Sequence, residues 1–387
     1  MKIWLINILL LISTGLTAQI ITGAERTEEY LPLLKEKRIA FAGNHTSMIK
    51  NISVVDSLLS CGINVVKIFS PEHGFRGTED AGKTIQTIKD SKTGLPVISL
   101  YGKSKKPQAS DLEDIDIIVF DIQDVGVRYF TYISTMHYLM EACAENKKTL
   151  IILDRPNPNG YYIDGPVLDT AFRSFVGMHP VPIVHGMTIG EFAQMINGEG
   201  WLGKNLTCEL KVIPCKNYTH QTIYTLPVKP SPNLSSSRAI ELYSTLCLFE
   251  GTPLSVGRGT PFPFQVVGHP SLKGKTESNF NFTPVPTAGA TNPPLKDQLC
   301  YGYDFSQKNW IDTIPGIKLE LIIDVYKNFP DKNLFFNKNL FFDKLAGNSA
   351  LRKAIIGGKS ASEIREGWQK DLELFRRMRA KYLLYPD

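Results

Sequence analysis

The first half of the chain alternates short, continuous apolar runs with segments whose apolar residues recur every three or four positions. This alternation is typical of parallel strands joined by helices. The apolar runs are rich in β-branched residues, so we expect strands that are buried on both faces. The predicted strands are 39–43, 65–70, 97–101, 115–120 and 150–153. The predicted helices are 52–59, 132–145 and 187–196.

The helix predicted at 187–196 has a capping box at its start, because Thr188 stands three residues before Glu191. The pattern changes near residues 227–237, where three prolines and three consecutive serines interrupt the periodicity. Beyond that segment we expect a strand at 317–325 and an amphipathic helix from about 360 to 382. The sequence therefore predicts an α/β domain over residues 19–235 and a smaller α+β domain over residues 236–387.

The amino-terminus has the pattern of a secretory signal peptide over residues 1–18. Lys2 precedes an apolar run, and Ala18 offers a small residue before a cleavage point. The run is shorter than the roughly 20 apolar residues that span a bilayer, and no cysteine follows the cleavage point to carry a lipid. We therefore expect an exported protein, periplasmic or secreted, without a stable membrane anchor.

Composition and motifs exclude several classes of function. The net charge is 43 − 38 = +5 and is scattered, which argues against a nucleic-acid partner. The six cysteines have no zinc-site spacing, and buried thiols are expected, with a local bridge between Cys208 and Cys215 as the alternative. No nucleophile elbow, zincin helix or dinucleotide-binding turn is present. We therefore expect neither a metal nor another cofactor.

Polar clusters follow four of the predicted strands, at 44–46, 71–77, 121–129 and 154–160. In open parallel sheets, ligands bind beyond the carboxyl ends of the strands. Polar residues at a single strand end often form a turn or a helix cap, but four such clusters at one edge of the sheet indicate a functional site.

Glu72 is the leading catalytic candidate. Pro71 and Gly74 bracket Glu72 and His73, which predicts a tight loop in place of a strand. A partly buried carboxyl group in such a loop can act as a general acid or base. The alternative for Glu72 is an ion pair within the loop with Arg76. His73 is a substrate-binding candidate, and its alternative is a hydrogen bond that holds the loop.

Asp121 and Asp124 are the other catalytic candidates. They stand three residues apart at a strand-to-helix turn, where one fits a helix cap and the other a site residue. Arg128 suits a ligand that carries a carboxylate, and Tyr129 and Tyr132 suit the apolar face of a sugar. An ion pair between Arg128 and Asp124, with the two tyrosines in the core, is the alternative.

The remaining candidates are polar residues that could contact a substrate. The glycine-rich loop at 255–260 either faces the site or forms a solvated turn. An ion pair between Asp154 and Arg155 is the alternative to a substrate contact by Asp154. These substrate-binding candidates are Asn44, Arg76, Asp154, Asn157, Glu250 and Arg258.

Five strings, in order along the chain, resemble the NamZ family of exo-β-N-acetylmuramidases, glycoside hydrolase family 171. The strings are Phe69-Ser-Pro-Glu-His-Gly-Phe-Arg-Gly77, Asp121-Ile-Gln-Asp-Val-Gly-Val-Arg-Tyr129, Asp154-Arg-Pro-Asn-Pro158, Pro230-Ser-Pro-Asn233 and Ser255-Val-Gly-Arg-Gly-Thr260. The resemblance covers nearly all of the expected mature chain. It implies a Rossmann-like catalytic domain, a smaller carboxyl-terminal domain and an active-site cleft between them.

The resemblance also implies an activity, the release of N-acetylmuramic acid from the non-reducing end of peptidoglycan disaccharides and muropeptides. It makes Glu72 the catalytic residue. The lactyl carboxylate of the sugar would then pair with Arg128 or Arg258. A second catalytic group would be Asp121, Asp124, Glu250 or the 2-acetamido group of the substrate itself. An N-acetylglucosaminidase and a non-catalytic binder of peptidoglycan fragments are the alternatives.

Overall fold

The computed structural model describes residues 19–72, 74–76, 88–102, 104–276, 279–314 and 316–387. The predicted signal peptide and His73 lie outside the described residues. Among the helices of the described ranges, none combines the length and the apolar composition that crossing a bilayer requires.

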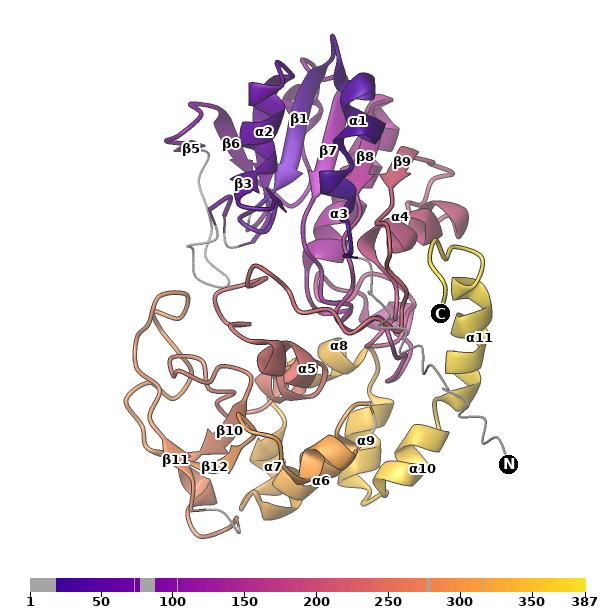
Figure 1. The fold of residues 1–387 in the computed structure, drawn as a ribbon. Helices are drawn as coiled ribbons and strands as arrows, with labels where there is room; N and C mark the ends of the chain where they lie inside the picture. Colours follow the sequence, from indigo (N-terminus) through magenta and orange to yellow (C-terminus); the bar gives the residue numbers. More distant parts are fainter. Residues whose placement is uncertain (1–18, 73, 77–87, 103, 277–278, 315) are drawn as a thin grey trace, which may run out of the picture.

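A seven-stranded sheet forms the centre of the amino-terminal part (Figure 1). Its order is β5-β6-β4-β1-β7-β8-β9, and only the edge strand β5 runs antiparallel to its neighbour. The prediction of a parallel α/β sheet is confirmed. The strands are β1 (Arg38–Gly43), β4 (Asn64–Ser70), β5 (Ile88–Lys89), β6 (Pro96–Ser99), β7 (Ile117–Asp121), β8 (Thr149–Leu153) and β9 (Glu209–Ile213).

The sequence did not predict β9, because polar and apolar residues alternate along this exposed edge strand. A small hairpin pairs β2 (Met48–Ile49) with β3 (Ile52–Ser53). The helices of this part are α1 (Thr27–Leu34), α2 (Val54–Ser60), α3 (Tyr132–Asn146) and α4 (Ile189–Gly198). The capping box of α4 is confirmed, since Thr188 and Glu191 each accept a hydrogen bond from the other's backbone N–H.

The carboxyl-terminal part combines a small antiparallel sheet with helices. The sheet has the order β10-β12-β11, formed by β10 (Val266–His269), β11 (Asn281–Phe282) and β12 (Cys300–Asp304). The helices are α5 (Ser237–Leu246), α6 (Leu319–Asn328), α7 (Lys332–Phe335), α8 (Phe341–Ala346), α9 (Ala350–Ile356), α10 (Ala361–Glu366) and α11 (Gln369–Arg379).

Two predictions for this part are wrong in detail. The segment predicted as a strand at 317–325 forms most of α6, because Leu319, Ile322 and Val325 recur every three residues and are buried on one face of a helix. The predicted helix at 360–382 is two helices that break at Gly367 and Trp368. All six cysteines are free, so the alternative of a local Cys208–Cys215 bridge is not realised.

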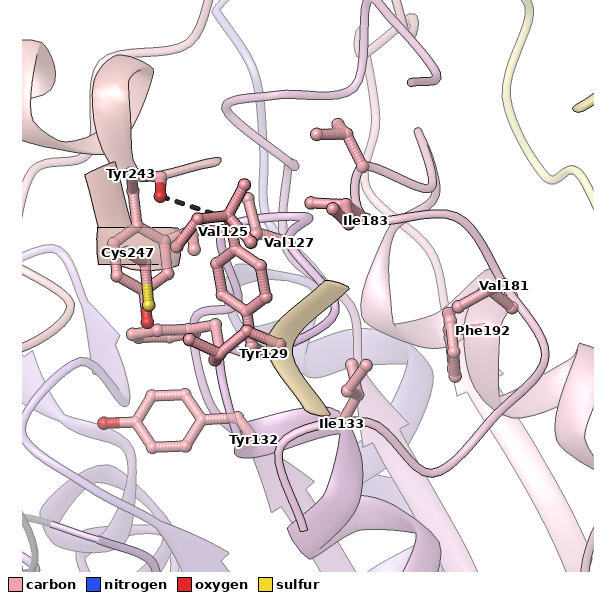
Figure 2. Close-up of a cluster of buried hydrophobic side chains, with 14 of the residues drawn as sticks. Val125, Val127, Tyr129, Tyr132, Ile133, Val181, Ile183, Phe192, Tyr243 and Cys247 are labelled. Atoms are coloured by element: carbon pink, nitrogen blue, oxygen red, sulfur yellow. Dashed lines mark hydrogen bonds between the residues drawn. The ribbon is translucent and has the colours of Figure 1, made fainter. Parts of the chain in front are cut away.

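One hydrophobic core runs through both parts of the chain. Figure 2 shows Tyr129 close to Tyr243 and Cys247, which belong to the carboxyl-terminal part. The chain also returns to the sheet after α11 (Figure 1), where the Tyr385 hydroxyl donates to Asp154 at 2.5 Å. The two parts are therefore packed as one body, and the domain boundary at residue 235 stays a prediction.

Candidate active site

Glu72 lies in the loop after β4. The loop is tight, because Gly74 has a φ of +77° and donates its N–H to the Pro71 carbonyl at 3.2 Å. The Glu72 carboxylate accepts a hydrogen bond from the Thr131 hydroxyl at 3.0 Å. Thr131 occupies the N-cap position of α3, but its side chain makes no capping bond. Its hydroxyl therefore donates to Glu72 and does not cap the helix.

A pocket next to Glu72 draws its walls from both parts of the chain. Among the described residues that line it, Glu72 carries the only carboxyl group and Arg258 the only guanidinium group. The structure thus brings four sequence candidates together: Glu72, Tyr129, Tyr132 and Arg258. The lining residues are Glu72, Tyr129, Phe130, Thr131, Tyr132, Ser231, Asn233, Leu234, Tyr243, Arg258 and Phe264.

Aromatic rings form one wall of this pocket and pack edge to face. The ring centroids of Phe130 and Tyr132 are 4.7 Å apart, and those of Tyr243 and Phe264 are 4.9 Å apart. The Tyr132 hydroxyl is held by the Asn44 amide at 3.0 Å and donates to the Pro230 carbonyl at 3.2 Å. Asn44 therefore lies behind Tyr132 and fixes its ring. Tyr129 and Tyr132 are buried in the core, as the alternative for them predicted, and both also line the pocket.

Arg258 supplies a positive charge to the pocket from the carboxyl-terminal part. Its Nε donates to a Glu250 carboxylate oxygen at 2.7 Å, and its guanidinium lies 4.8 Å from the centre of the Phe264 ring. The Glu250 carboxylate raises the pKa of Arg258. Both terminal nitrogens of Arg258 have no hydrogen-bond partner among the described residues, so they are available to a carboxylate ligand. Glu250 positions Arg258 and does not line the pocket.

Arg128 does not line the pocket. It is buried and donates to three backbone carbonyls, those of Pro166 at 2.9 Å, Val181 at 2.6 Å and Leu345 at 2.9 Å. Burial without a carboxylate partner lowers its pKa to about 9. Arg128 thus ties α8 to loops of the amino-terminal part, and the alternative of an ion pair with Asp124 is not found.

Asp121 and Asp154 are buried, and both accept hydrogen bonds from residues that do not line the pocket. Both Asp121 oxygens accept from Arg155, at 2.5 and 2.8 Å. Asp154 accepts from the Thr188 hydroxyl at 2.7 Å and from the Gly190 N–H at 2.8 Å, besides Tyr385. Burial raises the pKa of both carboxyl groups, that of Asp154 to about 6. These contacts hold β7, β8, α4 and the chain end together.

Asn157 and Arg76 also have partners outside the pocket. The Asn157 amide donates to the Met187 carbonyl at 2.9 Å and accepts from the Asn159 N–H at 2.8 Å. Arg76 makes two hydrogen bonds to Asp90, at 2.9 and 2.7 Å. Arg76 therefore pairs with Asp90 and not, as the alternative for Glu72 had predicted, with Glu72 itself. Both residues shape the loops at the carboxyl ends of the strands.

Asp124 lies in the buried loop after β7. One of its oxygens accepts from the Gly126 N–H at 2.7 Å and lies 4.0 Å from Nε2 of His185. The other oxygen has no hydrogen-bond partner among the described residues. Burial raises the pKa of Asp124 to about 7 and lowers that of His185 to about 3.

The wild type is expected to lose stability as the pH rises from about 4 to 7. Asp124→Asn is expected to remove this loss. The Asp124 carboxyl ionises near 3.8 in the unfolded chain but keeps its proton to about pH 7 in the folded protein. The wild type therefore loses stability through this window, by up to about 4 kcal/mol. Urea unfolding at pH 5 and pH 8 measures the effect, and the advantage of the variant should be larger at pH 8. An equal difference at both pH values would contradict the assignment.

Sequence reasoning missed Thr131, Ser231, Asn233 and Tyr101. Ser231 and Asn233 lie in the proline-rich segment, which was interpreted as a boundary and as one of the five strings of the resemblance, but not as a source of site residues. Tyr101 was placed inside a predicted strand, although β6 ends at Ser99. Its position directly after a strand was the available signal. Within the described ranges, no group of three or more His, Cys, Asp or Glu residues is arranged to hold a metal ion.

Comparisons with known proteins place this geometry in a family. Models of the amino- and carboxyl-terminal parts of the exo-β-N-acetylmuramidase NamZ match residues 39–238 and 241–385. A Bacillus subtilis (strain 168) protein described as peptidoglycan β-N-acetylmuramidase NamZ is 39% identical over 376 residues, which covers 92% of this chain and 89% of that protein.

Two crystal structures of DUF1343 family proteins from Bacteroides fragilis NCTC 9343 have the same fold. One is 51% identical, with a TM-score of 0.88 over 96% of this chain and 100% of the other. The second is 31% identical, with a TM-score of 0.78 over 95% of this chain and 99% of the other. The resemblance seen in the five sequence strings is confirmed, and the chain belongs to the exo-β-N-acetylmuramidase NamZ family of glycosidases.

Proposed function

We propose that this protein is an exported glycosidase that releases N-acetylmuramic acid from the non-reducing end of peptidoglycan fragments, in cell-wall turnover or muropeptide salvage. Family membership supports the reaction class. The observation that carries the proposal is the pocket in which Glu72 faces an aromatic wall and the free end of Arg258. The signal-like pattern at residues 1–18 supports export, since peptidoglycan lies outside the cytoplasmic membrane.

In this proposal Glu72 acts on the glycosidic oxygen. A carboxylic acid next to the scissile bond protonates the leaving oxygen as its bond to the anomeric carbon breaks. Water forms the new bond to that carbon, and the proton that the water releases restores the acid. Tyr129 and Tyr132 lie behind the ring of the terminal sugar, and Arg258 pairs with the lactyl carboxylate. Arg258 is the better partner of the two arginines that the sequence offered, because backbone carbonyls occupy the terminal nitrogens of Arg128.

The reaction is tested with a disaccharide that carries N-acetylmuramic acid at its non-reducing end, followed by mass spectrometry of the products. Free N-acetylmuramic acid is the expected result. Saturable binding without any product would favour the non-catalytic binder. Cleavage that prefers a terminal N-acetylglucosamine would favour the hexosaminidase.

Arg258→Gln is expected to remove the preference for muramic acid. A charge-assisted hydrogen bond contributes about 1.5–3 kcal/mol, so kcat/KM on the muramic substrate should fall by roughly 10- to 100-fold. The rate on the matching N-acetylglucosamine substrate, which has no lactyl carboxylate, should change by less than about threefold. Paired chromogenic sugars measure both rates.

Arg365→Gln is the matched control for this variant. Arg365 also pairs with a glutamate, Glu320 at 2.6 Å, and has a similar side-chain exposure of 22% against 18% for Arg258, but it lies outside the pocket. It should leave the preference intact. An equal loss on both sugars in Arg258→Gln would show that Arg258 has no part in recognising the carboxylate.

A further inference from the structure

The register of the sheet places Tyr101 beside Glu72. β4 and β6 are parallel neighbours, and Ser70 is the partner of Ser99 at their carboxyl ends. The ladder extends one step further, because the Leu100 N–H donates to the Ser70 carbonyl at 2.8 Å. Glu72 and Tyr101 each follow two residues after these partners. Both residues therefore leave the ladder at the same edge of the sheet, where the carboxyl ends of the two strands lie side by side.

The Tyr101 side chain lies next to Glu72. Its hydroxyl is close enough to the Glu72 carboxyl for the charge of that group to act on the phenol. Burial and the neighbouring Glu72 charge raise the pKa of Tyr101 well above its usual value, so the phenol stays protonated and can donate. The Glu72 carboxyl thus has two hydroxyl neighbours from different segments, Thr131, which donates to it at 3.0 Å, and Tyr101.

The Tyr101 ring is itself held in place. Its centroid lies 5.9 Å from that of Phe175, and Lys105 Nζ lies 4.4 Å from the centre of the Phe175 ring. The Phe175 carbonyl accepts from the Ser134 hydroxyl at 2.7 Å. Ser134 belongs to α3, the helix that follows Thr131. These contacts form a closed circuit. It runs from Glu72 through Tyr101, Phe175 and Ser134 to Thr131, and Thr131 donates back to Glu72.

We propose that Tyr101 is a positioning residue for the reaction, which holds the Glu72 carboxyl in one orientation toward the pocket. Tyr101 does not line the pocket, so it acts through Glu72 and not on the substrate. The circuit through Phe175 and α3 fixes the hydroxyl of Tyr101 before substrate arrives, and such preorganisation accelerates the chemical step more than it tightens binding. This inference rests on the proposed function.

Tyr101→Phe tests the proposal by removing one hydroxyl and keeping the ring against Phe175. Loss of the hydroxyl that orients Glu72 should lower kcat by about 10- to 100-fold, with KM within about threefold of the wild type. Tyr138→Phe is the matched control, because Tyr138 is also half-buried and stacks on Phe175 at 6.4 Å. That variant should keep the kcat of the wild type.

Three outcomes would overturn the proposal. They are an unchanged kcat in Tyr101→Phe, an equal loss in Tyr138→Phe, or a rise in KM without a fall in kcat. A crystal structure of Tyr101→Phe tests it independently of activity, and the Glu72 carboxyl should leave its wild-type orientation or occupy more than one. If the wild type releases no sugar, the proposed function fails, whereas the orientation of Glu72 in this variant still decides the role of Tyr101.

Discussion

Glu72→Gln is expected to fold like the wild type and to lose the release of N-acetylmuramic acid almost completely. Positioned general acids and bases contribute about 10²- to 10⁴-fold to enzymatic rates, and a loss of kcat in that range is expected here. Glutamine keeps the shape of the side chain and one oxygen that can accept from Thr131 or Tyr101. It cannot give a proton to the leaving oxygen, so the loss should fall on kcat and leave binding of the sugar nearly intact.

Glu241→Gln is the control for that variant. Glu241 lies on α5, which also borders the pocket through Tyr243, but its carboxylate accepts from Arg238 at 3.0 Å and does not line the pocket. Its kcat should stay within about twofold of the wild type. Product release from the disaccharide, followed by mass spectrometry, gives the rates, and calorimetry with N-acetylmuramic acid gives the affinities. Undiminished turnover by Glu72→Gln would remove Glu72 from the mechanism.

Asp121→Asn is expected to destabilise the fold by about 3–5 kcal/mol. Asp121 is fully buried at the end of β7, and its two oxygens bind the buried guanidinium of Arg155. Asparagine has the same shape but leaves the Arg155 charge without a counter-ion in a medium of low polarity. The free energy of unfolding from urea titrations measures the loss.

Asp116→Asn is a matched control near the other end of the same strand. Asp116 also pairs with an arginine through both oxygens, Arg38 at 2.8 and 3.2 Å, but the pair is solvent-exposed. Solvent screens an exposed pair, which therefore contributes little to stability, so this variant should stay close to the wild type. The double variant Asp121→Asn/Arg155→Gln should recover part of the lost stability, since it removes the unpaired charge. A stable Asp121→Asn protein that lost only activity would instead make Asp121 a catalytic group.

The lining of the pocket depends on contacts between distant segments. Tyr129 and Tyr132 follow β7, Ser231 and Asn233 come from the proline-rich segment, and Arg258 comes from the glycine-rich loop. The continuous core beneath them, in which Tyr129 packs on Tyr243 at 5.5 Å, holds these segments in register. Changes in the core between the two parts should therefore alter the site without touching its polar groups.

The sequence by itself determined the parallel sheet, the loop that carries Glu72 and the capping box of α4, because each depends on residues close together in the chain. Continuous β-branched runs, the bracket of Pro71 and Gly74, and the spacing of Thr188 and Glu191 act locally. The tertiary structure alone decided the partners of the charged candidates. Arg128 donates to backbone carbonyls up to 217 residues away, and Asp121 pairs with Arg155, which lies in the loop after β8. Backbone carbonyls have no signature in a sequence, and strand register is set by packing across the sheet, so only the folded chain could place Tyr101 against Glu72.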